Sequence, residues 1–187
     1  MSHIQLPDAT FYLFLLSNDR DAALKVKAAG CCFCAGPLDN APYQRKPRHT
    51  PADLPDEFNT VFSLCCRHEG CRKRAPPPSF RFFGRRVYLL FILIKACADG
   101  GRDAKGLIAE NARSWGVSRQ ALRSWYEFWR VNFVNSGFWR VSKGILPTSF
   151  EEVSIPELLL KSFGCTSYSE EPWRKLVQFL STYNHQN

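Results

Sequence analysis

The chain has 187 residues and a formal net charge of +8; 45% of its residues are hydrophobic and 14% are aromatic. This length suits one generous domain or two small ones, and this apolar content excludes a wholly disordered chain. The longest strongly apolar run, Val87 to Ile94, is too short for a membrane span, and the N-terminus lacks the pattern of a secretory signal. We therefore expect a soluble, cytoplasmic protein with no membrane partner.

The positive charge is concentrated in two stretches of the chain. Residues 45–86 carry a net charge of +6 and residues 102–143 a net charge of +5, whereas both ends are weakly acidic. A basic middle part of this kind favours a polyanionic partner such as nucleic acid.

Residues 1–30 predict two short helices. Asp19 is placed to cap the second helix, and Gly30 to end it in a left-handed conformation.

Residues 31–83 lack helical periodicity, because prolines recur between Pro37 and Pro55 and again in the run "APPPS". The pattern indicates loops and short strands. This stretch also holds six of the eight cysteines, and in a reducing compartment clustered cysteines bind metal more often than they form disulfides.

The cysteines have the spacing of a structural metal site. Cys31 and Cys34 form a Cys-x-x-Cys pair, and Cys66 and Cys71 form a Cys-x4-Cys pair. Four thiolates at about 2.3 Å around one ion are a usual structural zinc site. We predict that these four residues bind zinc.

Two neighbours compete with Cys66 for this role. Cys65 and His68 would each reach the ion with a different loop conformation. The alternative to a metal site is a set of reduced thiols packed as small hydrophobic side chains, or a redox pair. As non-ligands, Cys32 and Cys65 are expected in the core of this region.

Residues 84–140 begin with "RRVYLLFILIKACA", which is long and apolar enough for a buried helix, although a strand has the same periodicity. Cys97 is expected in the apolar core. The predicted buried helix ends at Asp99-Gly100-Gly101.

The stretch "GLIAENARSWGVSRQALRSWYEFWR" predicts a helix, a turn at Gly116 and a second helix capped by Ser118. Apolar Leu122, Trp125 and Trp129 share one side of the second helix. This is the order of elements in a helix-turn-helix.

With that side buried, Arg119, Gln120 and Arg123 face outward. Arginine and glutamine suit guanine and adenine edges in the major groove of DNA. The alternative is a plain helical hairpin whose arginines form a solvated face.

Residues 141–187 predict two helices opened by Ser154 and Ser169. Their apolar runs "IPELLLKSF" and "WRKLVQFL" offer a face for protein docking or dimerisation, and Cys165 is expected in the core. The six rings of Trp125, Tyr126, Phe128, Trp129, Phe138 and Trp139 are too many to face inward together, which also favours an interaction surface.

The segments "CCFCAGPL", "FSLCCRHEGCRKRAPPPSFRFFGRRVYL" and "ENARSWGVSRQALRSWYEFWR" resemble the zinc ribbon and helix-turn-helix of bacterial insertion-sequence transposases and of small accessory proteins of mobile elements. The resemblance covers about residues 31–130. It implies joint binding of element-end DNA by both parts, a nucleoid-associated location, and a recombinase or transposase as partner of the C-terminal helices. The Cys-x4-Cys spacing departs from the tighter spacing usual in such ribbons.

A basic belt follows the last expected ligand, and we expect it to contact DNA phosphates. It consists of Arg72, Lys73, Arg74, Arg81, Arg85 and Arg86.

No catalytic pattern accompanies these features. The acidic residues after Arg130 all lie at predicted helix starts, where capping and helix-dipole roles explain them. They are Glu151, Glu152, Glu157, Glu170 and Glu171.

The sequence thus predicts a mainly helical protein with a small zinc ribbon of loops and short strands, a helix-turn-helix region and additional C-terminal helices. We expect a non-enzymatic, zinc-containing accessory protein of a mobile element that binds specific double-stranded DNA. The alternatives are a zinc-stabilised protein-interaction module or transcription regulator, and RNA as the ligand.

Overall fold

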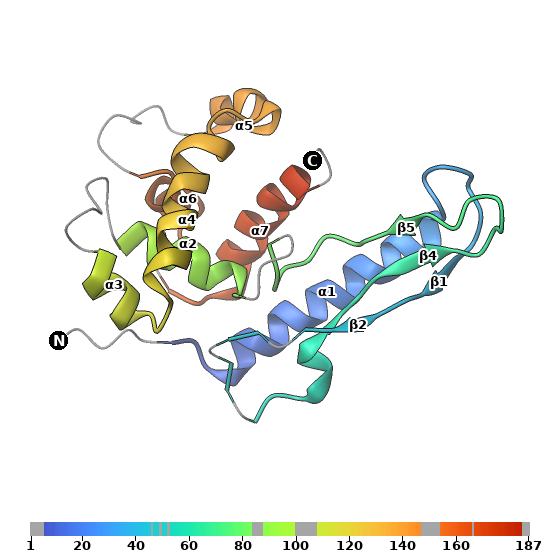
Figure 1. Ribbon diagram of the computed structural model, residues 1–187, viewed down its shortest axis with the longest axis horizontal. Coiled ribbons are helices and arrows are strands. Elements are labelled where there is room, and N and C mark those ends of the chain that lie inside the picture. The colour runs from blue at the N-terminus through green and yellow to red at the C-terminus, as the bar shows by residue number, and fades with distance from the viewer. Residues whose placement is uncertain are drawn as a thin grey trace. The chain divides into compact units, whose positions relative to one another are not determined.

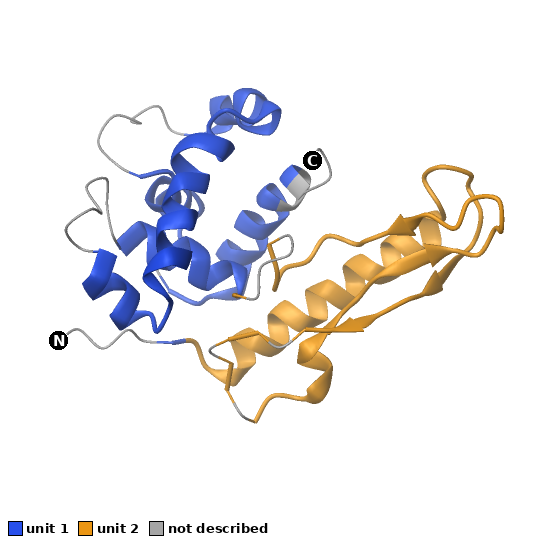
Figure 2. Cartoon of the chain, viewed as in Figure 1, with its two compact units in different colours: residues 1–6, 89–187 blue, residues 7–88 orange. Residues whose placement is uncertain are grey.

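The computed structural model describes residues 6–45, 47–48, 50–51, 53–83, 88–99, 108–146, 154–165 and 167–184. Two compact units make up the chain (Figures 1 and 2). Unit 2 is Pro7–Tyr88, and unit 1 is Met1–Leu6 together with Leu89–Asn187. The protein is mainly helical with a small sheet. This division differs from the four predicted segments, because the N-terminal helix and the cysteine-rich stretch belong to one unit.

Unit 2 begins with one long helix, α1 (Ala9–Ala29), where the sequence predicted two short ones. Asp8 is its N-cap, and its side chain accepts a hydrogen bond from the Phe11 N–H. The prediction that Asp19 caps a second helix was wrong, because Asp19 lies buried in the middle of α1. Gly30 ends the helix with a φ of 78°, a positive value that favours glycine, although its ψ of −174° is not that of the left-handed helix.

The rest of unit 2 consists of loops and short strands, as predicted. β1 (Leu38–Asn40), β4 (Leu64–Cys66) and β5 (Arg74–Ala75) form an antiparallel sheet in the order β1-β4-β5, with Leu38 opposite Cys66. β2 (Tyr43–Gln44) and β3 (Thr60–Val61) pair in a second ladder. The Ala41 N–H donates to Ser63 O at 2.8 Å between the two ladders, so the strands form one long ribbon beside α1 (Figure 1).

Two sets of contacts join α1 to the ribbon. Near the start of the helix, the Tyr12 ring meets Phe58 of the 3₁₀ helix η1 (Asp56–Asn59) edge-on, with ring centroids 5.7 Å apart. Near its end, Val26 packs against a small core of Leu38 and Leu64 together with two cysteines. The helix therefore covers the ribbon up to its cysteine-bearing end.

Unit 1 is built from helices around α2 (Leu90–Asp99), the buried helix expected from the apolar run. Helix α2 packs against α3, α4 and α6, and α6 packs against α7. The other elements are α3 (Ile108–Ser114), α4 (Arg119–Glu127), the π-helix η2 (Phe128–Phe133), α5 (Gly137–Ser142), the 3₁₀ helix η3 (Lys143–Ile145), α6 (Ile155–Phe163) and α7 (Glu170–Asn184).

The C-terminal helices are capped largely as expected. The Ser154 side chain accepts a hydrogen bond from the Glu157 N–H at the start of α6. Glu170 and Glu171 lie in the first turn of α7, where their charge favours the helix N-terminus. Glu151 and Glu152 lie outside the described residues. None of the helices in the described ranges combines the length and apolar character needed to cross a membrane.

Five of the six rings that were expected to be too many for the core lie inside unit 1, and the sixth, Tyr126, is half-buried, so none of them is an exposed ring. Trp125, Phe128, Trp129, Phe138 and Trp139 are all at most 6% exposed. The π-helix explains the difference, because its wider turn breaks the α-helical period and brings Phe128 and Trp129 inward together. The apolar side chains that suggested a docking face on the C-terminal helices are also buried, among them Leu158, Leu159, Trp173, Leu176, Val177 and Leu180.

Candidate metal centre and candidate nucleic-acid interface

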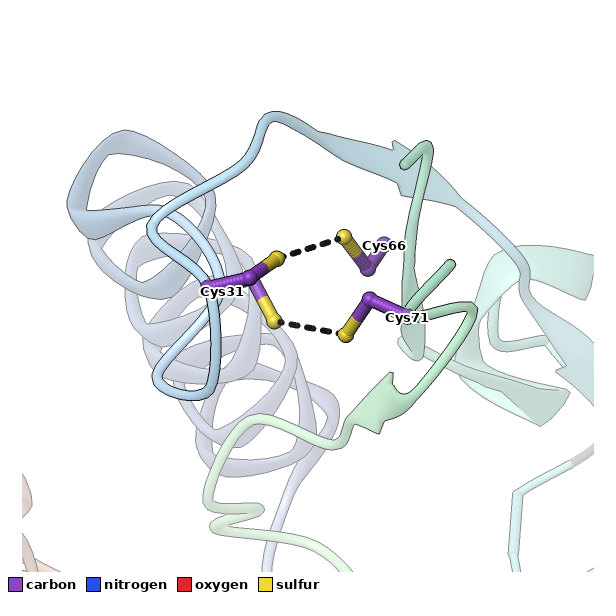
Figure 3. A group of neighbouring side chains, drawn as sticks. Cys31, Cys66 and Cys71 are labelled. Carbon is purple, nitrogen blue, oxygen red and sulfur yellow. Dashed lines mark hydrogen bonds between the residues drawn. The ribbon is translucent and has the colours of Figure 1, made fainter. Parts of the chain in front are cut away.

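The four predicted metal ligands come together at the end of the ribbon in unit 2. The sulfur atoms of Cys31, Cys34, Cys66 and Cys71 all lie within 4.8 Å of one another. The Cys31 and Cys71 sulfurs are 3.7 Å apart, and the Cys34 and Cys66 sulfurs are 3.4 Å apart. Figure 3 shows Cys31 on one side of the group and Cys66 and Cys71 on the other. Sulfurs held tetrahedrally at about 2.3 Å from one ion would be about 3.8 Å apart, so this donor set fits a metal ion.

Each cysteine pair lies on a loop that we call a knuckle: knuckle 1 is residues 31–36 and knuckle 2 is residues 66–73. The two loops close with the same backbone hydrogen bond. The Cys31 N–H donates to Gly36 O, and the Cys66 N–H donates to Lys73 O, both at 2.9 Å. In each case the acceptor lies two residues after the second cysteine of the pair. The Cys-x-x-Cys and Cys-x4-Cys loops are thus closed by equivalent backbone hydrogen bonds despite their different lengths.

The same loops direct backbone N–H groups at the sulfurs. The residue two positions after each cysteine donates its N–H to that cysteine: Phe33 to Cys31, Gly36 to Cys34, His68 to Cys66 and Lys73 to Cys71. Backbone N–H groups, that of Phe33 foremost, lower the pKa of the Cys31 thiol to about 7. Burial and the neighbouring thiols outweigh the N–H donors at the other three cysteines and raise the pKa of each. These donors favour the thiolate, which is the form of cysteine that binds metal.

A positive φ follows the second cysteine of each pair. Ala35 has a φ of 54° and Arg72 a φ of 48°. This left-handed conformation turns the next N–H back toward the sulfur, as in other tight turns that use it. The backbone of Gly36 also passes close to the cluster, since a Cβ there would make tight contacts of 3.3 Å with the Cys34 and Cys66 sulfurs.

The competing ligands do not join the cluster. The Cys65 sulfur lies 3.4 Å from Arg72 O, to which it donates, and is outside the group of four. His68 contributes its backbone, because its C=O accepts from the Arg72 N–H at 3.0 Å. The prediction that Cys32 and Cys65 fill the core of this region was wrong, since Cys32 is exposed and Cys65 is half-buried. Leu38 and Leu64 take that place.

The remaining two cysteines are buried in unit 1, as expected. Cys97 and Cys165 are each at most 1% exposed. Burial raises the pKa of the Cys165 thiol to about 12, which keeps it protonated and unreactive.

The basic belt separates into exposed and buried members. Arg72, Lys73 and Arg74 are exposed on knuckle 2 and the first residue of β5. None of the three forms an ion pair with a carboxylate of the described residues. Arg85 and Arg86 lie outside the described residues.

Arg81, which the sequence placed in the phosphate-binding belt, is fully buried. Its Nε donates to Asp19 Oδ2 at 2.7 Å, and its terminal nitrogens donate to the carbonyls of Phe58 and Thr60. The Asp19 carboxylate also accepts from the Ser79 hydroxyl and the Phe80 N–H. The prediction that Arg81 contacts DNA was therefore wrong, and this side chain instead joins α1 to the ribbon.

In unit 1 the turn between α3 and α4 has a defined geometry. The Val117 N–H donates to Ala112 O and the Gly116 N–H to Arg113 O, which is the Schellman pattern, and Gly116 has the left-handed φ of 59° that this pattern uses. Ser118 then caps α4 by accepting from the Ala121 N–H at 3.1 Å.

A buried amide fixes the two helices against α2. The Asn111 Nδ2 donates to Ala96 O at 2.6 Å and to the Tyr126 hydroxyl at 3.0 Å. Burial raises the pKa of Tyr126 to about 12. The position of α4 is thus set by polar contacts as well as by packing.

The three predicted base-contacting residues lie on the exposed side of α4. Arg119, Gln120 and Arg123 are exposed, whereas Leu122 and Trp125 are buried. This is the orientation that the sequence pattern predicted.

Sequence reasoning missed an aromatic residue at the candidate metal centre. Phe33 lies between the two cysteines of knuckle 1, is 60% exposed, and has the Lys73 ammonium 4.0 Å from its ring centroid. A large apolar residue between two ligands was the signal that could have identified it.

Comparisons of the chain with models of protein families, with curated proteins and with solved structures found no match.

Proposed function

We propose that the protein binds specific duplex DNA through α4, and that one zinc ion held by Cys31, Cys34, Cys66 and Cys71 maintains the fold of unit 2. Four sulfur donors in a tetrahedral arrangement favour zinc among the common biological metals. The ion would join the two knuckles, which contain little regular structure of their own. Its role here is structural, because all four positions are taken by protein ligands.

The observation that carries the DNA-binding proposal is the orientation of α4. Its first turns expose Arg119, Gln120 and Arg123 together, opposite the buried side chains of Leu122 and Trp125. Within the part of the chain that the structure describes, these three side chains form no ion pair. A capped helix with free arginine and glutamine at its start suits major-groove contacts.

The basic residues at the end of knuckle 2 and the start of β5 support the proposal independently. Arg72, Lys73 and Arg74 would contact phosphates, which strengthens binding to all sequences alike. The resemblance noted in the sequence makes the ends of a mobile element the proposed target, and an accessory role beside a recombinase or transposase the proposed biological function.

The test is a selection of binding sites from random duplex DNA with the wild-type protein and with Arg123→Ala. One bidentate arginine–guanine contact contributes roughly 1–3 kcal/mol of discrimination. The variant is therefore expected to lose preference at one base position while non-specific binding falls only slightly. Arg140→Ala is the matched control, because Arg140 is an exposed arginine of the same unit on another helix, α5. Identical preferences for wild type and Arg123→Ala, or none in the wild type, would overturn the proposal.

A second candidate function is a protein-interaction module. Val141 and Ile145, on α5 and η3, are 83% and 77% exposed. Exposed apolar side chains of this size mark some interaction sites. The salt dependence of the affinity for DNA decides between the two. A steep loss of DNA affinity with added salt is expected of the DNA-binding protein and not of the protein-interaction module.

A further inference from the structure

The exposed face of the metal centre combines an aromatic ring with three positive charges. Phe33 projects from knuckle 1 with 60% of its surface exposed. Lys73 lies against the ring, with Nζ 4.0 Å from the centroid. Arg72 and Arg74, the neighbours of Lys73, are exposed as well.

The metal-binding loops hold this ring and its cation in place. The Phe33 N–H donates to the Cys31 sulfur, and the Lys73 N–H donates to the Cys71 sulfur. The Lys73 C=O accepts from the Cys66 N–H at 2.9 Å. Both residues therefore have a backbone fixed by the cysteine cluster, so the ring is presented in a defined position.

An ammonium ion near one face of a ring leaves the other face available. The flat faces that stack on aromatic side chains in nucleic-acid complexes belong to unpaired bases, since the bases of a duplex are already stacked on one another. Such a base brings its phosphates with it, and Arg72, Lys73 and Arg74 are the charges that would neutralise them.

We propose that Phe33 is a stacking platform for an unpaired nucleobase, with Arg72, Lys73 and Arg74 binding the adjoining phosphates. This site goes beyond the proposed duplex contacts of α4 and uses residues of unit 2 alone. It would let the protein bind single-stranded or locally unpaired nucleic acid.

The experiment measures the affinity of the full-length, metal-loaded protein for fluorescently labelled oligothymidylate, which has no base pairs. Stacking of one base changes affinity by about five- to hundredfold. Phe33→Ala and Phe33→Leu are both expected to weaken binding in this range, because neither retains a flat ring. Phe33→Trp is expected to keep or increase the affinity. Metal content is measured for each variant, so that a loss of the metal centre is not mistaken for a loss of stacking.

Tyr43→Ala is the matched control. Tyr43 is another exposed ring of unit 2 beside a cation, 44% exposed with the Arg45 guanidinium 5.6 Å from its centroid, but it lies on β2 and not at the metal centre. It is expected to leave the affinity unchanged. An oligouridylate arm shows whether the base comes from DNA or RNA.

Unchanged affinity in metal-loaded Phe33→Leu, or an equal loss in Tyr43→Ala, would overturn the proposal. These outcomes are separate from those that test α4. Loss of the duplex preference in Arg123→Ala does not depend on Phe33, and loss of oligothymidylate binding in Phe33→Leu does not depend on Arg123.

Discussion

The buried pair of Arg81 and Asp19 offers the clearest contrast between a structural and a DNA-binding role. Replacing Arg81 by methionine keeps a long side chain beside the rings of Phe58 and Phe82. It removes the 2.7 Å ion pair and leaves Asp19, only 3% exposed, without its charged partner. Breaking a buried pair from one side costs about 3–5 kcal/mol, a large part of the total stability of a small domain.

Urea denaturation followed by circular dichroism measures this effect, because α1 contributes strongly to the helical signal of unit 2. Arg74→Met is the control: Arg74 is exposed, and its side chain donates a 3.3 Å hydrogen bond to the Ser63 hydroxyl. Its stability should lie within about 0.5 kcal/mol of the wild type. The structural role would be refuted if Arg81→Met were as stable as Arg74→Met and bound DNA more weakly than the wild type. The phosphate contact predicted from the sequence would then be right.

Three further predictions concern metal binding, the helix cap at the start of α4, and the pH dependence of the protein's stability. Gly36→Ala should weaken metal binding, because its Cβ would lie 3.3 Å from two ligand sulfurs, whereas Gly70→Ala, with its nearest atom at 3.6 Å, should not; competition with a chelator measures both, and equal affinities would contradict the geometry. Ser118→Ala should destabilise unit 1 by about 1 kcal/mol through loss of the helix cap; an unchanged midpoint in the tryptophan-fluorescence urea curve would show that the cap is dispensable. Tyr126 has a pKa raised to about 12 by burial, so the folded state keeps its proton where the unfolded chain ionises, and stability should fall as the pH rises from about 10 toward 12; Tyr126→Phe should reduce that fall, and an identical pH profile would rule this residue out as its cause.

Features encoded by residues close together in the sequence were predicted well. The turn at Gly116 and the cap at Ser118 each depend on a few neighbouring positions, whose conformational preferences can be read directly. The four clustered cysteines come from two pairs far apart in the chain, and they were identified because the spacing within each pair is typical of metal sites. The buried side of α4 followed from the helical period of its apolar residues in the same way.

Features that depend on distant partners were missed. Aspartate is a residue type that often caps helices, which is why Asp19 was predicted to be a cap. Its partner Arg81 lies 62 residues away, and nothing in the local sequence indicates that the two side chains meet. A buried aspartate in the middle of a helix is stable only because that partner satisfies it. The π-helix at Phe128–Phe133 was missed for a related reason, since the packing of several aromatic rings sets the local period there.

The central claim is that four particular cysteines, and not their neighbours, hold a metal ion. Elemental analysis of the freshly purified protein and of single serine variants tests it most directly. The wild type is expected to contain about one zinc ion per chain, and Cys34→Ser and Cys66→Ser to lose most of it. The adjacent replacements Cys32→Ser and Cys65→Ser should retain the wild-type content, because neither sulfur belongs to the cluster. Protein without bound metal, or loss of zinc from Cys65→Ser with none from Cys66→Ser, would contradict the account.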